Sequence, residues 1–258
     1  MKIAMLAYGT RGDVQPYIAV ARELRRRGHS VVMTAPVNLV SMTERCGIEC
    51  VPVPIDSQAF FLSEEGRRIL SSGKTTQFLR ELGKQEHAVR EEMDAAVLRA
   101  CEGADLVITG ILMQYRAACS TERSGQRLIR LLTFPNTPTG QWTSPFLTPR
   151  QLPVPALRRL SHVVFAAVFF RGVRADIDAF RASIGLEKTN GAFTKRIEND
   201  LPSLHIYSEH VLPRPAEWPA PLELTGYCTL QKDARAALGE DRLPDDLARW
   251  LDAGPPPA

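Results

Sequence analysis

Short apolar runs alternate with longer amphipathic stretches along most of this chain. The apolar runs are rich in β-branched residues and predict seven strands, at Lys2–Tyr8, Ser30–Ala35, Ile48–Val53, Asp105–Thr109, Arg127–Phe134, Ser203–Tyr207 and Leu222–Thr225. The stretches between several of these runs place apolar residues every three or four positions, which predicts helices. Strands that alternate with helices are typical of a parallel sheet with helices on both faces, so we predict an α/β fold.

Two helices and one loop are well marked in the sequence. The helix after the first strand has its apolar side at Tyr17, Val20, Ala21 and Leu24, and it ends in three arginines before Gly28. A second helix presents Val89, Met93, Ala96, Val97 and Ala100 on one face. The proline-rich segment over residues 132–155 predicts an irregular surface loop, and such loops often carry binding residues.

Composition and charge exclude several classes of protein. The 258 residues carry 32 basic and 29 acidic side chains, so the formal charge of +3 is too small to predict a nucleic-acid partner. Five cysteines are scattered without a CxxC pair, which indicates reduced thiols in a cytoplasmic protein and no metal site. The N-terminus shows no secretion signal, and the longest apolar run, over residues 163–170, is too short to span a bilayer.

The candidate chemistry lies in "YGTRGDVQP", residues 8–16, at the end of the first strand. Open parallel sheets bind ligands at this edge, and we expect Gly9 and Gly12 to allow a tight turn close to a ligand. The spacing of the glycines lacks the GxGxxG of a dinucleotide site and the GK[ST] of a P-loop. An unrelated Rossmann-type enzyme, such as an epimerase or a reductase, is therefore disfavoured.

The segment "GTRGDVQPYIAVARELRRRGHSV" resembles the N-terminus of the inverting GT-B glycosyltransferases of family 1, which act on sterols and on glycopeptide or macrolide-type aglycones. "PLELTGYCTL" is similar to the closing strand of that family's N-terminal domain, and "LPDDLARWLDAGPPPA" to the helix and proline linker that follow it. The resemblance implies a Rossmann-like acceptor-binding domain over residues 1–240 and the start of the interdomain linker over residues 241–258.

The same resemblance implies a second, C-terminal domain that binds most of the donor, and the motif of that domain is absent from this chain. No further cofactor is implied, because the co-substrate is a UDP or TDP sugar. We therefore expect this chain to be the acceptor-binding half of a hexosyltransferase and to have little or no activity alone. The alternative is a non-catalytic auxiliary or ligand-binding module with the same fold.

The resemblance also assigns roles within the motif. Asp13 occupies the position of the general base that takes the proton of the acceptor hydroxyl. Gly9, Thr10, Arg11 and Gly12 would lie beside the donor diphosphate. From the residues alone, Asp13 could simply cap the helix and Arg11 could form a surface salt bridge.

A bulky apolar acceptor carrying a hydroxyl group needs an apolar cleft. Loops after the predicted strands supply the candidates Phe60, Phe61, Met113, Tyr115, Phe134, Asn136, Trp142 and Phe146. Core packing is the simpler interpretation for Phe134 and Met113, which adjoin strands, whereas Trp142 lies in the irregular loop and is the stronger candidate.

The segment "PALRRLSHVVFAAVFFRGVRADIDAF" combines a strongly apolar run with four arginines. Such a helix could make a peripheral membrane contact, although helices of this kind more often pack on their own domain. Within it, Asp176 and Asp178 spell the DxD of metal-dependent transferases. Residues two apart on a helix point in different directions, so we predict no metal site here.

Overall fold

The computed structural model describes residues 1–73 and 75–254, without the side chains of residues 70, 72, 75, 76, 78 and 79. Residues 255–258 of the expected proline linker therefore lie outside the described residues. The strands are β1 (Lys2–Leu6), β2 (Ser30–Pro36), β3 (Glu49–Val53), β4 (Leu106–Thr109), β5 (Arg127–Leu132), β6 (Ser203–His205) and β7 (Leu222–Leu224). All seven predicted strands are confirmed, with ends that differ by a few residues.

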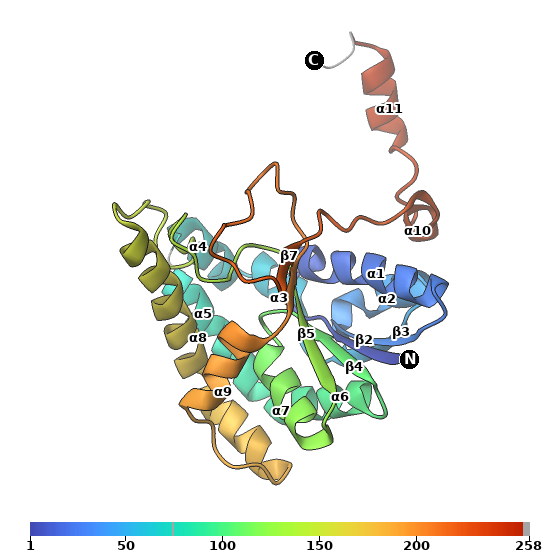
Figure 1. Ribbon diagram of the computed structural model, residues 1–258. Coiled ribbons are helices and arrows are strands. Elements are labelled where there is room, and N and C mark those ends of the chain that lie inside the picture. Colours follow the sequence, from blue (N-terminus) through green and yellow to red (C-terminus); the bar gives the residue numbers. More distant parts are fainter. Residues whose placement is uncertain (74, 255–258) are drawn as a thin grey trace.

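The helices lie between these strands along the chain, except for the last two, which follow β7 (Figure 1). They are α1 (Arg11–Arg26), α2 (Val40–Arg45), α3 (Ser57–Leu62), α4 (Glu64–Ser72), α5 (Thr75–Ala88), α6 (Arg90–Cys101), α7 (Gln114–Ser124), α8 (Pro155–Ser183), α9 (Gly191–Lys195), α10 (Lys232–Leu238) and α11 (Asp245–Asp252). A short 3-10 turn (Val37–Leu39) precedes α2, and a π-helical turn (Arg196–Asp200) follows α9.

The sheet is entirely parallel, in the order β3-β2-β1-β4-β5-β6-β7. The chain moves outward from β1 to β3 and then returns to the other side of β1 with β4. Leu6 at the end of β1 is paired with Thr34 of β2 and with Thr109 of β4. The order of the strands reverses between β1 and β4, which opens a crevice at their carboxyl ends, where such sheets bind ligands.

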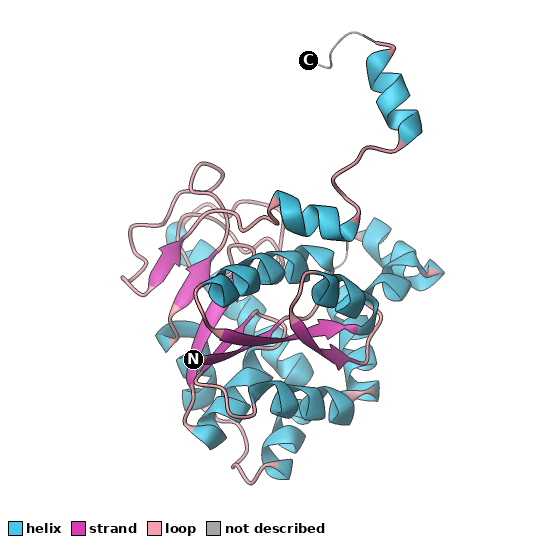
Figure 2. Cartoon of the chain, turned by 90° about the vertical axis from the view of Figure 1, so that its right-hand side faces the viewer, coloured by secondary structure: helices cyan, strands magenta, loops and turns pink. Residues whose placement is uncertain are grey.

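Helices cover both faces of the sheet, as predicted (Figure 2). Buried residues form two clusters, one on each face. Ala4 and Leu6 of β1 belong to the first cluster, with Met93 of α6 and Phe165 of α8. Ile3 and Met5 of β1 belong to the second cluster, which also contains α1 residues. A strand buried on both faces reads as a continuous apolar run, and this explains the "IAML" of β1.

The proline-rich segment between β5 and α8 is irregular, as predicted, but it is not only a surface loop. Thr137, Thr139, Thr143 and Ser144 are buried. The Trp218 ring stacks on the His205 ring with their centroids 4.5 Å apart, and the Trp218 indole N–H donates to the Pro138 carbonyl at 3.2 Å. The segment is buried because residues some 80 positions later in the chain fold over it.

The end of the chain differs from the rest. Helix α11 has no buried residue and stands away from the sheet (Figure 1), and Trp250 on it is 69% exposed. Among the residues that the structure describes, no helix has the length and apolar character needed to span a membrane.

Candidate active site

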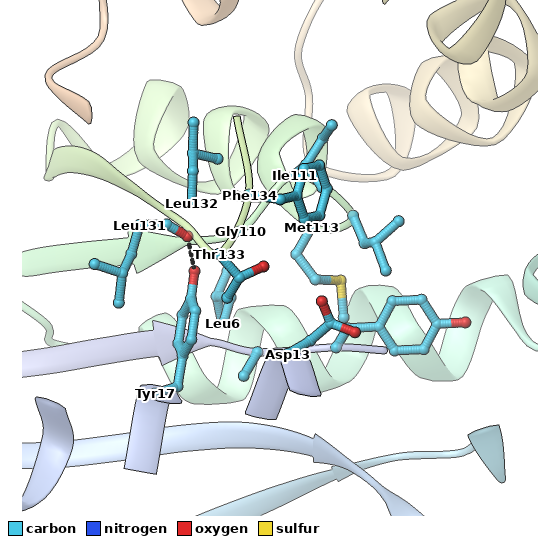
Figure 3. Close-up of a pocket in the computed structure, with 13 residues that line it drawn as sticks. Leu6, Asp13, Tyr17, Gly110, Ile111, Met113, Leu131, Leu132, Thr133 and Phe134 are labelled. Carbon is cyan, nitrogen blue, oxygen red and sulfur yellow. Dashed lines mark hydrogen bonds between the residues drawn. The ribbon is translucent and has the colours of Figure 1, made fainter. Parts of the chain in front are cut away.

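An apolar cavity that is partly open to solvent lies at the carboxyl edge of the sheet, and the empty space in it, including its open mouth, is about 890 Å³. Its walls come from the residues that directly follow β1, β4 and β5, together with side chains of α3, α5 and α8. A smaller recess shares part of this wall and adds Tyr17, Gly110, Met113 and Thr133 (Figure 3). Asp13 lines both spaces, so its carboxyl group lies where they meet.

Asp13 is held in place by the start of α1. Thr10 is the N-cap residue of this helix, and Asp13 is three positions later. One carboxylate oxygen, Oδ2, accepts hydrogen bonds from the Thr10 backbone N–H at 2.8 Å and from the Thr10 hydroxyl at 3.1 Å. Asp13 therefore does cap the helix, but through a single backbone amide.

Gly9 is required by the position of Asp13. Its φ of +124° is a conformation that side-chain-bearing residues rarely adopt, and a Cβ built at Gly9 would lie 2.4 Å from Asp13 Oδ2. Gly12 has no positive φ and lies within α1, where a Cβ would meet only the Thr10 hydroxyl at 3.5 Å. We expected both glycines to form the turn, and only Gly9 does.

The surroundings of Asp13 favour proton uptake. Burial raises the pKa of its carboxyl group above the ordinary value, and hydrogen bonds from Thr10 and Thr133 partly oppose that rise. Tyr17 lies in the same recess, but its hydroxyl donates to the Leu131 carbonyl at 2.6 Å (Figure 3). A partly desolvated carboxylate with a raised pKa is suited to general-base chemistry.

The walls of the large cavity are mainly aromatic and aliphatic. The rings of Phe134, Phe146, Phe165 and Phe169 follow one another along one side, with successive centroids 5.1, 4.9 and 6.1 Å apart. Phe165 stacks on Phe146 and on Phe169. The cavity therefore offers a continuous apolar surface, with the Asp13 carboxyl group among its few polar groups.

The structure places the predicted acceptor residues in three different surroundings. Phe60, Phe61, Phe134 and Phe146 line the large cavity, and Met113 lines the smaller recess. Tyr115 is buried in the core, where its ring packs 4.9 Å from that of Phe170.

Asn136 and Trp142 are not among the residues that line either space. The Trp142 ring instead contacts Trp218 edge-on, at 6.1 Å between centroids. We expected Trp142 to be a stronger candidate for the acceptor site than Phe134. In the structure Phe134 lines the cavity and Trp142 does not, because the loop packs its tryptophan against Trp218.

Several cavity residues were missed by the sequence reasoning. They are Tyr8, Ile55, Ser57, Leu82, Gln85, Ile111, Leu112, Phe165 and Phe169. The apolar run over residues 163–170 was recognised, but the run is apolar on every side, so its pattern does not reveal which rings face a cavity.

Arg11 lies on the surface, with its side chain 50% exposed. Its Nη2 donates to Glu240 Oε1 at 2.5 Å, and its Nε donates to Gln15 Oε1 at 2.8 Å. The surface salt bridge considered as the alternative is therefore present, and contact with a diphosphate stays a prediction.

A buried ionic cluster lies behind the cavity wall. Arg116 of α7 donates to Asp94 of α6 at 2.8 Å, and its Nη1 is 3.7 Å from Glu86 Oε2 on α5. Burial raises the pKa of Glu86 to about 7 and that of Asp94 to about 6, and Arg116 opposes both shifts. The cluster therefore ties α5, which supplies Leu82 and Gln85 to the cavity, to the layer beneath it.

The two carboxylates of the DxD sequence bind different partners. Asp176 Oδ1 is 2.7 Å from His87 Nδ1, whereas Asp178 Oδ1 accepts from the backbone N–H and the hydroxyl of Thr189, both at 2.7 Å. Within the described part of the chain, no group of three or more His, Cys, Asp or Glu side chains could hold a metal ion.

Comparison with known proteins gives a consistent result. Residues 3–109 match the family described as the glycosyltransferase family 28 N-terminal domain. The chain is 34% identical over 236 residues to O-mycaminosyltylonolide 6-deoxyallosyltransferase of Streptomyces fradiae, covering 88% of this chain and 54% of that protein. It is 28% identical over 277 residues to a sterol 3-beta-glucosyltransferase of Arabidopsis thaliana, covering 100% of this chain and 42% of that protein. This chain therefore spans about half the length of these curated relatives.

Solved structures share the fold. A glycosyltransferase of Streptomyces sp. SF2575 superimposes with a TM-score of 0.51 at 16% identity, over 90% of this chain and 55% of that one. The calicheamicin glycosyltransferase superimposes with a TM-score of 0.54 at 17% identity, over 88% of this chain and 52% of that one. The expected resemblance is confirmed, with the matched domain named after family 28 rather than family 1. Residues 3–109 therefore belong to the glycosyltransferase family 28 N-terminal domain family, and the seven-stranded sheet around them is a fold shared with antibiotic glycosyltransferases of the GT-B type.

Proposed function

We propose that this chain binds the acceptor of a glycosyl transfer in the large cavity and that Asp13 is the general base. The observation that carries the proposal is the position of the Asp13 carboxyl group, which lies in the wall of an apolar cavity at the strand-order reversal of the sheet. Four aromatic rings in sequence along the wall suit a bulky apolar acceptor such as a sterol, a polyketide or another hydroxylated ring system.

The proposed reaction needs one proton transfer from the acceptor hydroxyl to this chain. The acceptor enters with its reactive hydroxyl toward Asp13, whose carboxylate accepts the proton as the hydroxyl oxygen attacks the anomeric carbon of the sugar. The bond from that carbon to the diphosphate breaks, the nucleoside diphosphate leaves with the electron pair, and the configuration inverts. Thr10 holds Oδ2, so Oδ1 is the oxygen that we assign to the acceptor proton.

The diphosphate would lie over the start of α1. Here Thr10 and the helix N-terminus can donate hydrogen bonds, and Arg11 can exchange its contact with Glu240 for a contact with the diphosphate. We propose that most donor contacts come from a second domain, as expected of proteins about twice this length. These 258 residues by themselves would then bind the acceptor without transferring sugar.

The first experiment is equilibrium binding to the chain, by ligand-observed NMR with a panel of hydroxylated apolar aglycones and with UDP and TDP sugars. The expected result is binding of some aglycones and little binding of nucleotides. Tight nucleotide binding without aglycone binding would overturn the proposal.

The role of Asp13 is tested by Asp13→Asn. The variant should bind an aglycone from the panel with an affinity close to that of the wild type. When the second half of the Streptomyces fradiae relative is supplied as a fusion, its turnover should fall by at least about 100-fold, which is typical for loss of a general base. Unchanged turnover would remove Asp13 from the mechanism, and aglycone binding without turnover in either fusion would favour a non-catalytic binding module.

A further inference from the structure

The outward side of α8 carries an exposed apolar stripe that nothing in the described structure covers. Figure 1 shows this helix along one outer edge of the molecule. We name the stripe the α8 outer face and define it as Leu157, Leu160, Val163, Val164 and Val168, with exposures from 38% to 52%. Four of these residues are spaced three, four and four apart, so they form one line along the helix.

The opposite side of the same helix is also apolar. Phe165 and Phe169 are buried and line the large cavity. This part of α8 therefore has apolar side chains on its inner and outer sides, unlike a surface helix of a water-soluble domain. A contiguous exposed set of this kind marks an interaction surface rather than a solvated face.

Charge around the stripe identifies the kind of partner. No aspartate or glutamate occurs between Glu122 and Asp176. Arg150, Arg159 and Arg171 lie before, within and after the stripe in sequence, and all three are exposed. None of the three takes part in an ion pair among the described residues. The α8 outer face therefore presents aliphatic side chains together with uncompensated positive charge, which complements an anionic surface.

A second copy of this chain fits the stripe poorly. Two outer faces aligned antiparallel about Val164 would place Arg159 near the partner's Arg171, and a parallel alignment would place identical arginines together. Like charges at such positions oppose pairing. The stripe also lacks the tryptophan and tyrosine that anchor most protein–protein interfaces.

We propose that the α8 outer face docks on an anionic lipid bilayer. Leucine and valine side chains enter the boundary between headgroups and acyl chains, and Arg159 and Arg171 bind lipid phosphates. Docking in this way is peripheral. It places the wall of the cavity next to the lipid surface, since Phe165 and Phe169 lie on the other side of the docked helix.

The test measures binding of the full chain to vesicles by cosedimentation. Vesicles of phosphatidylcholine mixed with phosphatidylglycerol should retain the protein at least about tenfold better than phosphatidylcholine alone, and added salt should weaken the binding. The double variant Leu160→Glu, Val164→Glu should lose at least about tenfold in affinity for the mixed vesicles, as should Arg159→Glu, Arg171→Glu.

Matched controls are Val211→Glu and Arg67→Glu, which change an exposed valine and an exposed arginine elsewhere on the chain. Both should bind the mixed vesicles like the wild type. Circular dichroism checks that every variant is folded. The α8 variants should bind aglycones like the wild type in the NMR assay, because surface charge on α8 does not alter the rings on its inner side. Loss of vesicle binding alone therefore tests this proposal separately from the proposed function.

Three results would overturn the proposal. They are absence of vesicle binding, equal binding to both kinds of vesicle, and binding that the α8 double variants leave unchanged. Sedimentation velocity is run alongside. A dimer that the Leu160→Glu, Val164→Glu variant abolishes, without any vesicle binding, would mean that a second copy covers this face.

Discussion

At the scale of single residues, Asp13 shows how one carboxyl group can serve the fold and a proposed reaction together. Its Oδ2 caps α1 through Thr10, and burial raises its pKa despite this bond. A carboxylate tied to several amides would have a lowered pKa and would be a poor base. With only one backbone amide bound, capping and proton uptake are compatible in Asp13.

Replacing Gly9 should disturb this arrangement directly. Gly9→Ala forces a side chain into a φ of +124° and places its Cβ against Asp13 Oδ2. We expect a loss of about 1–3 kcal/mol in the free energy of unfolding, measured with urea, because strained backbone positions cost about this much. Acceptor affinity should also fall.

Gly12→Ala is the control for Gly9→Ala, since Gly12 lies in α1 without a positive φ and has room for a Cβ. It should unfold at the wild-type urea concentration or slightly above it. Equal effects of the two substitutions would contradict our account of Gly9.

The hydrogen bond from Thr133 lowers the pKa of Asp13. Thr133→Val removes this bond at nearly constant volume, so the pKa of Asp13 should rise further above its ordinary value. A carbon-detected NMR titration of the Asp13 carboxyl group measures the change. Thr148→Val, on the loop before α8, should leave the titration as in the wild type. A pKa that falls in Thr133→Val would show that the hydroxyl does not stabilise the carboxylate.

At the scale of elements, α8 contributes most to the shape of the cavity. Its Phe165 and Phe169 continue the row of rings begun by Phe134 and Phe146 on the preceding loop. The helix itself follows from the sequence, because Pro155 stands at its first position and a long apolar run lies within it. Its role in the cavity follows only from where the loop before it directs the helix.

Phe165→Leu tests this role without emptying the core. Leucine keeps most of the volume but loses the stacked contact with Phe146. We expect aglycone affinity to fall by about tenfold, equivalent to about 1.4 kcal/mol, because aromatic pairs contribute about this much beyond area burial. An NMR titration with an aglycone that binds the wild type measures this affinity.

Trp142→Phe is the control for Phe165→Leu, since Trp142 contacts Trp218 rather than the cavity. Its aglycone affinity should stay close to that of the wild type. If Trp142→Phe weakened binding more than Phe165→Leu, the proline-rich loop and not α8 would form the acceptor surface.

At the scale of the whole molecule, the late segments of the chain fold over the early ones. Glu217 accepts hydrogen bonds from the Thr139 hydroxyl at 2.5 Å and from the Gly140 N–H at 2.8 Å, and Trp218 packs on His205. These contacts hold the proline-rich segment, and through it the Phe134 and Phe146 walls of the cavity, against β6.

His205 makes this assembly sensitive to acid. Burial lowers the pKa of His205 to about 3, whereas an exposed histidine titrates near 6.5. Between these values the unfolded chain binds a proton that the folded chain does not. The contribution of His205 to stability is therefore present above about pH 6.5 and is lost as the pH falls toward 3.

The measurement is urea unfolding across this pH range for the wild type and for His205→Gln. The variant should be less stable at neutral pH, because the contact with Trp218 is altered, but its stability should decline less steeply on acidification. An identical slope for both proteins would show that His205 does not control the acid response. His210→Gln, on an exposed residue, is the matched control and should keep the wild-type slope.

The sequence by itself determined the parts of this protein that depend on neighbouring residues. Runs of β-branched residues are enough to mark seven strands, and the residues after β1 are enough to mark the turn, the cap and Asp13, since these contacts span only a few positions. Parallel topology predicts that ligands bind at the carboxyl edge of the sheet. The motif at this edge is also the segment that carries the family resemblance.

Tertiary structure alone decided which side chains face the cavity and which face the core. Phe165 lines the cavity and Trp142 does not, because the Trp142 ring packs against Trp218, which lies 76 positions later in the chain. Arg11 pairs with Glu240 across 229 positions of sequence, and Arg116 buries its charge between two other helices. A periodic pattern records how apolar a residue's surroundings must be, but not whether a protein side chain, a ligand or a lipid supplies those surroundings.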